Sequence, residues 1–342
     1  SVARSDAEVT LASEAGDGGG AMAILRSLDD LEAGEVGAKA KAARTARRIL
    51  TRTFDDLRTT PAYDSHTYWD AVPEEVRAVL AASALLAVLG GAGDAARRYL
   101  DVALVAASAP PRDSRRVRAL KLALGDDDAE HDVCSEDEDD FVAVCVRDAG
   151  LSRSEWKEPR RVEASRAKVA LGLDRWPALG WRSARDALAP HAHRHVPVEE
   201  RRGEKPETAR VQRVVRVADL LRELESSESH HRRKQWYLAQ HRLFDQIPAL
   251  GRAVGASTIA VRAAWIGRAV ETPAHADPFD NVIVQLVGHK RWTVWPPRGF
   301  EKKEATTPPS PCPCPPRHFD LGPGDVLFVP RDWIHAVHTP DA

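Results

Sequence analysis

Residues 125–140, GDDDAEHDVCSEDEDD, carry ten acidic side chains in sixteen positions. Carboxylates at this density repel one another and resist burial in a packed core. We expect this run to be a solvated linker; the alternative is an acidic segment that docks onto a partner. In either case it divides the chain into two parts, and these parts show different sequence patterns.

The part before the linker has a helical pattern. Residues 21–124 are rich in Ala, Leu and Arg, and residues 73–111 predict two antiparallel helices around a Gly-Gly break. The side chains that fit one buried face of this pair are Val76, Val79, Leu80, Leu86 and Val88. The sequence therefore predicts an α-helical domain over residues 21–124, and residues 1–20, which end in a Gly-rich run, are expected to form a disordered N-terminus.

The part after the linker has the pattern of a β-protein. Short β-rich runs bounded by turn residues occur at 194–199, 210–224, 256–267, 281–288, 290–297 and 321–339. Many short strands with little helix between them are typical of a jelly roll. We expect an α+β protein, in which a double-stranded β-helix (jelly-roll) domain over residues 141–342 follows the helical domain.

Charge and cysteine content exclude several classes of partner. Lys plus Arg number 49 and Asp plus Glu number 51, so the formal net charge of −2 provides no field for nucleic acid or an anionic membrane. The four cysteines lack the paired C-x₂-C spacing of a zinc site. No run approaches the roughly 20 apolar residues of a membrane span, and the N-terminus has no apolar core of a secretory signal. We expect an intracellular protein, in the nucleus, the cytoplasm or both, with no direct nucleic-acid contact and no membrane.

A histidine and an aspartate begin the segment TPAHADPFDNVIVQLVGHKRW, residues 272–292. In a strand, residues i and i+2 point to the same face, so His275 and Asp277 would present an imidazole and a carboxylate side by side. His335, in a later strand, is a third candidate ligand, and two histidines with one carboxylate leave positions open on a metal ion. Taken alone, His-x-Asp is weak evidence and is more often a surface pair. The other histidine clusters, at 191–195 and 230–231, are expected to be solvated.

The surroundings of these residues carry a resemblance to a known family. The stretches concerned are RWPAL (175–179), VPVE (196–199), WYLAQHRLFDQIPAL (236–250), TPAHADPFDNVIVQLVGHKRW (272–292) and LGPGDVLFVPRDWIHAVH (321–338). Over residues 174–338 their order and spacing resemble the JmjC (jumonji C) family of 2-oxoglutarate oxygenases in the cupin superfamily. The resemblance is strongest to the arginyl-hydroxylase and lysine-demethylase 8 branch. It implies a cupin-like barrel, with His275, Asp277 and His335 as ligands of Fe(II) and with 2-oxoglutarate and O₂ as cosubstrates.

The resemblance also implies roles for residues that would hold 2-oxoglutarate. Lys290 matches the lysine that pairs with the distal carboxylate, and a lysine inside a barrel is costly without an anion. Tyr237 and Thr272 match hydroxyl donors to the same carboxylate, and Asn281 matches an amide that steadies the cosubstrate near the metal. Each has an alternative: Lys290 could extend to water, Tyr237 and Thr272 could be ordinary strand residues, and Asn281 could be a turn residue.

A basic side chain is the substrate that the resemblance implies. Glu199, Gln240 and Trp265 match positions that line the substrate pocket in this branch, and a carboxylate, an amide and an indole suit a guanidinium. The alternative for Trp265 is a core residue. Trp292 and Trp295 are expected to pack inside the barrel.

The expected function is hydroxylation of a basic residue, arginine, in a protein or peptide such as a histone, a ribosomal protein or a chromatin protein. A JmjC-type histone N-methyl-lysine demethylase shares every metal and cosubstrate residue and is the alternative enzyme. Members of the family continue into one more core strand, whereas this sequence stops at HTPDA, so we expect either a fragment of a longer protein or a barrel that lacks its last strand. That feature keeps open a third reading, an inactive scaffold that binds a partner through its helical domain.

Overall fold

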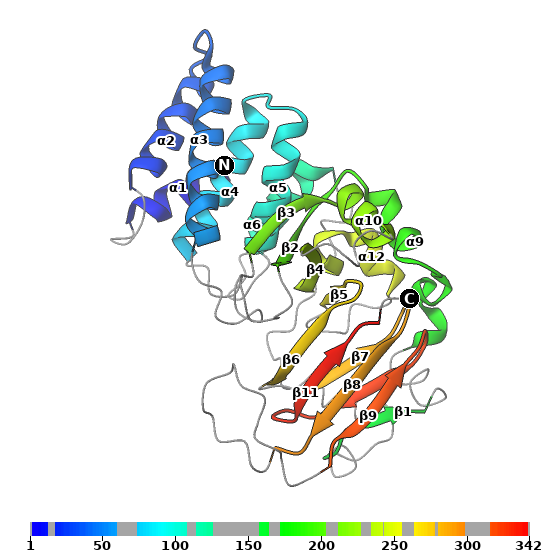
Figure 1. The fold of residues 1–342 in the computed structure, drawn as a ribbon. Coiled ribbons are helices and arrows are strands. Elements are labelled where there is room, and N and C mark those ends of the chain that lie inside the picture. Colours follow the sequence, from blue (N-terminus) through cyan, green and yellow to red (C-terminus); the bar gives the residue numbers. More distant parts are fainter. Residues whose placement is uncertain are drawn as a thin grey trace.

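The N-terminal part of the chain is helical in the computed structural model (Figure 1). The structure describes residues 2–12, 18–59, 74–107, 114–125, 157–163, 172–202, 211–226, 234–241, 243–254, 263–277, 280–297 and 315–340. The N-terminal helices are α1 (Val2–Ala12), α2 (Gly18–Glu32), α3 (Ala38–Thr59), α4 (Glu74–Leu89), α5 (Asp94–Ala107) and α6 (Ser114–Leu124). Residues 126–140 of the predicted acidic linker lie outside the described residues.

Small side chains let these helices pack closely around α4. Ala42 and Ala46 of α3 and Ala81 and Ala84 of α4 are fully buried in one apolar cluster. The turn after α4 is equally tight, because a Cβ at Gly90 would lie 2.6 Å from the Ala43 nitrogen. Only glycine fits there without a shift of the α3 backbone.

Two expectations for the helical part were wrong. Residues 2–12 form α1, in which Ala3 and Ala7 are buried and the Asp6 carboxylate pairs with Arg116 of α6 at 2.9 Å. The partner that orders α1 is 110 residues away, so the local composition gave no sign of it. Val88, expected to be buried, is 38% exposed because it lies on the outer side of the last turn of α4.

The described residues of the C-terminal part form three antiparallel sheets, with strand orders β1-β10-β7, β6-β11-β8-β9 and β3-β2-β4-β5. The strands are β1 (Arg160–Val162), β2 (His195–Arg202), β3 (Val211–Arg216), β4 (Lys234–His241), β5 (Ala264–Ile266), β6 (Glu271–Ala276), β7 (Asn281–Val284), β8 (Lys290–Trp295), β9 (Arg317–Leu321), β10 (Val326–Val329) and β11 (Ile334–His338). Short helices between them are η2 (Leu173–Arg175), η3 (Pro177–Gly180), α9 (Ala184–Leu188), η4 (Ala189–His191), α10 (Val217–Glu225), α11 (Leu243–Gln246) and α12 (Pro248–Ala253).

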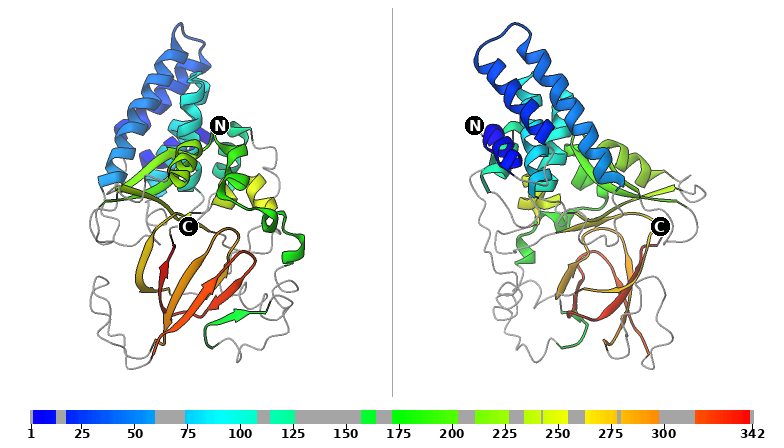
Figure 2. Two further views of the ribbon diagram at one scale, coloured as in Figure 1. Left: turned by 45° about the vertical axis from the view of Figure 1, so that its right-hand side comes forward. Right: turned by 90° about the vertical axis from the view of Figure 1, so that its left-hand side faces the viewer.

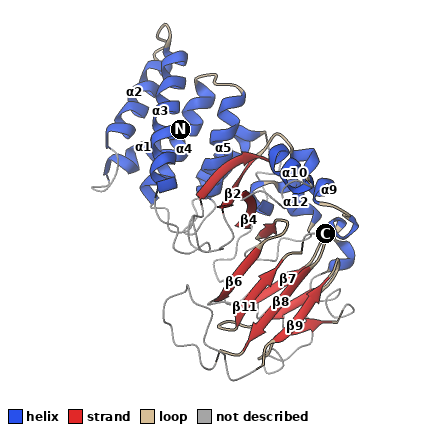
Figure 3. Ribbon diagram, viewed as in Figure 1, coloured by secondary structure: helices blue, strands red, loops and turns tan. Residues whose placement is uncertain are grey.

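Two of the sheets enclose a shared core. Trp292, Val294 and Val337 of the β6-β11-β8-β9 sheet are buried against Leu327 and Val329 of β10. The third sheet lies between this sandwich and the N-terminal helices, and α10 and α12 cover one of its faces (Figure 2). Figure 3 shows the N-terminal helices at one end of the molecule, the sandwich at the other, and α9, α10 and α12 between them.

The α+β class and the antiparallel strands agree with the sequence prediction. Strands occur in each of the six predicted runs, although in 256–267 only residues 263–267 are described. The run 321–339 holds two strands, β10 and β11, but they do not pair with each other, because each joins a different sheet. The division into a helical domain and a barrel domain at the predicted boundaries stays a prediction.

The contact at Gly90 gives a test of the helical packing. Gly90→Ala should lower the free energy of unfolding by about 1–3 kcal/mol, because its Cβ would press against the Ala43 backbone. Gly180→Ala is the matched control, since nothing lies within 4 Å of a Cβ at that position. Urea denaturation of both variants measures the difference, and equal stability of the two proteins would contradict the close approach.

Candidate metal centre

The pairing of β11 with β6 puts two histidines opposite each other. His335 in β11 is the cross-strand partner of His275 in β6, and on the other side β11 pairs with β8 through Val294. His335 and Val337 lie on the same face of β11, and Val337 belongs to the core between the two sheets. Both histidines therefore face the interior of the sandwich.

A turn and a loop bring the aspartate to these histidines. Asp332 adopts φ 64° in the turn before β11, where the Trp333 N–H donates to the Pro330 carbonyl at 3.3 Å. The Asp332 N–H donates to the Asp277 carbonyl at 2.8 Å. The next contact is between the Arg331 N–H and Oδ1 of Asp280 at 2.7 Å. These bonds hold the end of β6 against the start of β11.

The three side chains form a compact group of donor atoms. One ligand atom from each of His275, Asp277 and His335 lies within 4.8 Å of the others, and the two imidazole centroids are 4.2 Å apart. Asp277 and His335 are buried, at 6% and 3% exposure, and His275 is half-buried. Among the residues that the structure describes, this is the one group of three or more His, Cys, Asp or Glu side chains with such spacing.

Backbone carbonyls fix which nitrogen of each histidine faces the group. Nδ1 of His275 lies 2.8 Å from the Pro273 carbonyl, and Nδ1 of His335 lies 3.0 Å from the Trp333 carbonyl. A carbonyl only accepts, so each Nδ1 must carry the proton, and in a neutral ring Nε2 then has the lone pair that binds metal. Two such nitrogens and a carboxylate are a donor set that fits Fe(II) with open coordination positions.

Neighbouring side chains hold two of these groups in place. The Asn281 amide, at the start of β7, donates to Oδ2 of Asp277 at 2.5 Å. The Trp292 ring stacks on His335 with centroids 5.4 Å apart and an interplanar angle of 30°. The sequence assigned Asn281 to the cosubstrate, whereas in the structure its amide contacts Asp277. Trp292 packs in the core, as expected, and in addition stacks on His335. Neither contact was predicted, because each joins residues on separate elements.

Lys290 is the first residue of β8, and its desolvated ammonium is suited to bind an anion. Its ammonium contacts the Trp265 carbonyl at 3.3 Å, and no carboxylate of the described residues pairs with it. The residue is half-buried by its accessible surface, and desolvation of the ammonium lowers the pKa of Lys290 to about 8. An anion placed beside Lys290 would favour its protonated form.

Tyr237 lies near the same segment of chain as Lys290. This tyrosine, in β4, is 3% exposed, and a Cβ at Gly267 would lie 2.5 Å from its ring. Gly267 therefore gives the ring room, a role that the sequence did not reveal. Tyr237 and Lys290 are thus both brought against residues 265–267.

Thr272 shares a face with His275 although the two are three residues apart. Thr272 pairs with Val337 and His275 pairs with His335, so the register shifts by one residue between them. This β-bulge turns the half-buried Thr272 to the face of β6 that carries the candidate metal ligand His275.

Two of the predicted substrate residues lie on one face of the β3-β2-β4-β5 sheet. Glu199, which is 2% exposed, is the cross-strand partner of Tyr237. Their neighbours Val198 and Leu238 point into the apolar cluster under α10 and α12, so Glu199 and Tyr237 point the other way. Trp265 alternates with the buried Ala264 in β5 and is 40% exposed, so it is not the core residue of the alternative reading. The side chain of Gln240 in β4 lies outside the described residues.

One expectation about the remaining histidines was wrong. His195, in the cluster 191–195, is 8% exposed, and its Nδ1 lies 3.6 Å from Oδ2 of Asp101. The carboxylate comes from α5, which the sequence pattern had no means of placing beside β2. The pair at 230–231 lies outside the described residues.

The metal group gives a binding prediction. The protein should bind one Mn(II), as a substitute for Fe(II), and Asp277→Ala should abolish that binding because the carboxylate is a ligand. Asn281→Ala should weaken it by about 10–100-fold through loss of support to Asp277. Asp320→Ala, which removes an exposed carboxylate paired with Arg291, is the control and should change nothing. Electron paramagnetic resonance of free Mn(II) measures all four proteins, and wild-type affinity in Asp277→Ala would refute the centre.

No helix among the described residues combines the length and apolar character needed to cross a bilayer.

Residues 233–342 match the family model described as JmjC domain. The chain is 39% identical to Ribosomal oxygenase 2 of Rattus norvegicus over 20% of this chain and 15% of that protein. It is 28% identical to Jumonji C domain-containing protein 5 of Drosophila melanogaster over 49% of this chain and 50% of that protein.

A third relative, Lysine-specific demethylase 8 of Xenopus tropicalis, is 29% identical over 31% of this chain and 30% of that protein. The chain thus spans half or less of the length of these curated relatives. The family match begins in the region of β4 and includes all three candidate metal ligands. Residues 233–342 are thus similar to a JmjC domain, and this match together with the three relatives supports the JmjC oxygenase family for this part of the chain.

Proposed function

We propose that this protein is an Fe(II)- and 2-oxoglutarate-dependent oxygenase that hydroxylates an arginine side chain of a protein or peptide. The observation that carries the proposal is the group His275, Asp277 and His335, in which backbone carbonyls hold Nδ1 of both histidines and Nε2 of His335 lies 3.6 Å from Oδ2 of the buried Asp277. Oxygenase activity is also what the name of one relative states of that protein. Bound Fe(II) would supply the oxidation of a C–H bond at the expense of 2-oxoglutarate and O₂.

The residues around the candidate metal centre would hold the metal ligands in place and shield the reacting position from water. Asn281 holds one oxygen of Asp277, and Trp292 holds the ring of His335, so both candidate ligands are fixed before a metal arrives. The low exposure of Asp277 and His335 keeps bulk water from the reacting position.

Lys290 is the proposed partner of the distal carboxylate of 2-oxoglutarate. A lysine ammonium with a pKa of about 8 and no carboxylate partner among the described residues is poised to accept a dianion. Tyr237 lies against the same segment, and Thr272 shares the face of His275, which supports their assignment as hydroxyl donors. Asn281 is assigned to Asp277 in this proposal, with any contact to the cosubstrate made from that position.

The depressed pKa of Lys290 gives a pH test. Above pH 8 the unliganded lysine is largely neutral, so binding 2-oxoglutarate must take up a proton. The affinity of the Mn(II) protein for 2-oxoglutarate should therefore be flat below that pH and fall by about tenfold per pH unit above it. Isothermal titration calorimetry between pH 6.5 and 9.5 measures this profile.

Lys290→Arg is the control for that profile, because guanidinium stays protonated over the whole range. Its affinity should be lower in absolute terms but flat with pH, whereas Lys290→Met should bind weakly at every pH. The same fall above pH 8 in Lys290→Arg would show that another group titrates and would remove Lys290 from the site.

Arginine is the proposed substrate because of the chemistry on the face that carries Tyr237. The Glu199 carboxylate suits the paired N–H groups of a guanidinium, and the exposed Trp265 indole offers a ring for stacking. A methylated ammonium has few or no N–H donors and would depend on aromatic rings alone, of which Trp265 is the candidate.

Glu199→Gln should suppress the addition of one oxygen to arginine-containing peptides. Slow turnover of 2-oxoglutarate without peptide should persist, because Glu199 is not assigned to the metal or the cosubstrate. Glu35→Gln, an exposed residue in the turn between α2 and α3, is the control and should leave both activities unchanged. Mass spectrometry of the peptides and a succinate assay measure the two reactions.

Formaldehyde from methyl-lysine peptides, with no oxygen added to arginine peptides, would replace the proposal by the demethylase. A relative named Lysine-specific demethylase 8 makes that the second candidate. Metal binding without either product would favour the scaffold.

A further inference from the structure

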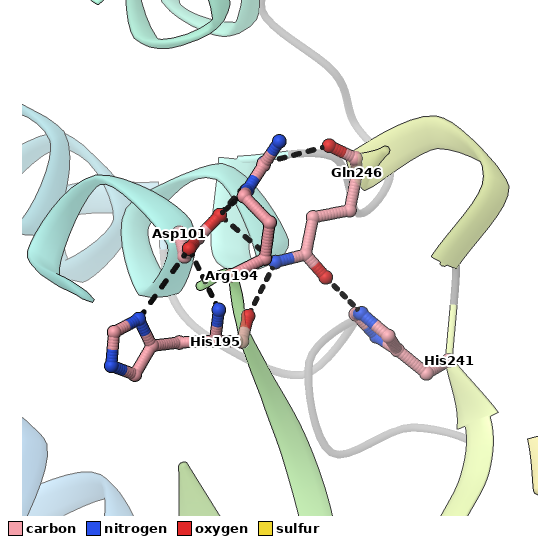
Figure 4. A network of polar contacts seen from close by, with 5 residues as sticks. All are labelled: Asp101, Arg194, His195, His241 and Gln246. Atoms are coloured by element: carbon pink, nitrogen blue, oxygen red, sulfur yellow. Dashed lines mark hydrogen bonds and ion pairs between the residues drawn. The ribbon is translucent and has the colours of Figure 1, made fainter. Parts of the chain in front are cut away.

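A buried carboxylate on the helical side of the molecule contacts the start of β2. Asp101 of α5 is 0% exposed. Its Oδ1 accepts from Nε of Arg194 at 2.8 Å, and its Oδ2 accepts from the His195 N–H at 2.8 Å (Figure 4). The Arg194 guanidinium and the His195 backbone amide both donate to this carboxylate. Asp101 therefore fixes the position of the chain where β2 begins.

Gln246, at the end of α11, extends this contact to β4. Its amide nitrogen donates to the His195 carbonyl at 2.6 Å and to Oδ1 of Asp101 at 3.2 Å. Its Oε1 lies 2.5 Å from Nε2 of His241, and its backbone carbonyl accepts from Arg194 at 3.0 Å. All five residues of this Asp101 network, drawn in Figure 4, are at most 8% exposed.

The Asp101 network contacts the ends of two neighbouring strands. His195 is the first residue of β2, and His241 is the last residue of β4. Between these points Glu199 of β2 lies opposite Tyr237 of β4. Because β2 and β4 are packed and hydrogen-bonded to each other, a displacement at one end of either strand also moves the side chains a few residues along it.

We propose that Asp101 is a positioning residue through which the N-terminal helices set the placement of Glu199 and Tyr237, and so the binding of the basic substrate and of 2-oxoglutarate. The assignment of those two ligands rests on the function proposed above. The effect of Asp101 on the strands does not rest on it.

The buried charges make the Asp101 network sensitive to loss of the negative charge on Asp101. Burial alone would raise the pKa of Asp101, but the His195 and Arg194 contacts outweigh it and hold that pKa below its ordinary value. The carboxylate is therefore ionised beside the buried Arg194 guanidinium, with 2.7 Å between them. Neutralising it would leave a cation in a low-dielectric interior, and the surroundings would rearrange around it.

The chain offers a matched control within the helices. Asp6 and Arg116 form another buried carboxylate–guanidinium pair, with 5% and 2% of their side chains exposed, and its contacts join α1, α6 and α4. Asp6→Asn should therefore loosen the helices without displacing β2 or β4. Asp101→Asn makes the same chemical change at the junction with the sheet.

Hydrogen–deuterium exchange on the whole, metal-free chain is the first measurement, and it is independent of any activity. Asp101→Asn should speed exchange of the amides in 195–202 and 234–241 by tenfold or more, and Asp6→Asn should leave those amides unchanged. Gln246→Leu, which keeps the Asp101–Arg194 pair, should speed exchange at the same two strand ends and serves if Asp101→Asn does not fold. Unchanged exchange in 195–202 and 234–241, or equal acceleration in Asp6→Asn, overturns the proposal.

Steady-state kinetics with Fe(II), 2-oxoglutarate and arginine peptide is the second measurement. Asp101→Asn and Gln246→Leu should raise KM for both substrates by tenfold or more while kcat changes less than threefold, and Asp6→Asn should leave both constants unchanged. Loss of kcat alone, with KM unchanged, overturns the positioning role even where exchange is faster. A wild-type protein without turnover would refute the proposed function, and the exchange data would then decide the role of Asp101.

Discussion

The antiparallel register between β6 and β11 is the constraint on which the candidate site depends. It places His335 opposite His275, and a slip of one residue would turn one of them to the other face of the sheet. The turn before β11 pins that register, because the Asp332 amide bonds to the Asp277 carbonyl. The same bond brings the aspartate beside the histidines, so the pairing of β6 with β11 determines the arrangement of all three candidate ligands.

Much of the fold and of the candidate site was predicted from local sequence patterns. The α+β class, the helix pair on either side of Gly90 and the short strands follow from periodicity and turn residues, which act over a few positions. The candidate ligands His275 and Asp277 were found because i and i+2 share a face in a strand. His335 could be offered only as a third candidate in a later strand, since no local rule pairs strands 60 residues apart, and the family resemblance then implied the same role.

Long-range contacts account for what the sequence did not predict. The helix at residues 2–12 is ordered by Arg116, and His195 is buried by Asp101, each through a partner about 100 residues distant. The bulge that turns Thr272 toward the face of His275 depends on which strand β6 meets, and the same is true of the Trp292 stack on His335. Burial of polar groups is favourable only where such partners are present, and a sequence without its fold does not show them.

The central claim is that His275, Asp277 and His335 bind one metal ion through the histidine Nε2 atoms. A crystal structure of the Mn(II)-loaded protein, with anomalous diffraction measured on both sides of the Mn absorption edge, tests it most directly. The account predicts one anomalous peak at about 2.0–2.3 Å from both Nε2 atoms and an Asp277 oxygen, as metal–ligand bonds require. A peak at another group of side chains, or coordination through Nδ1, would contradict it.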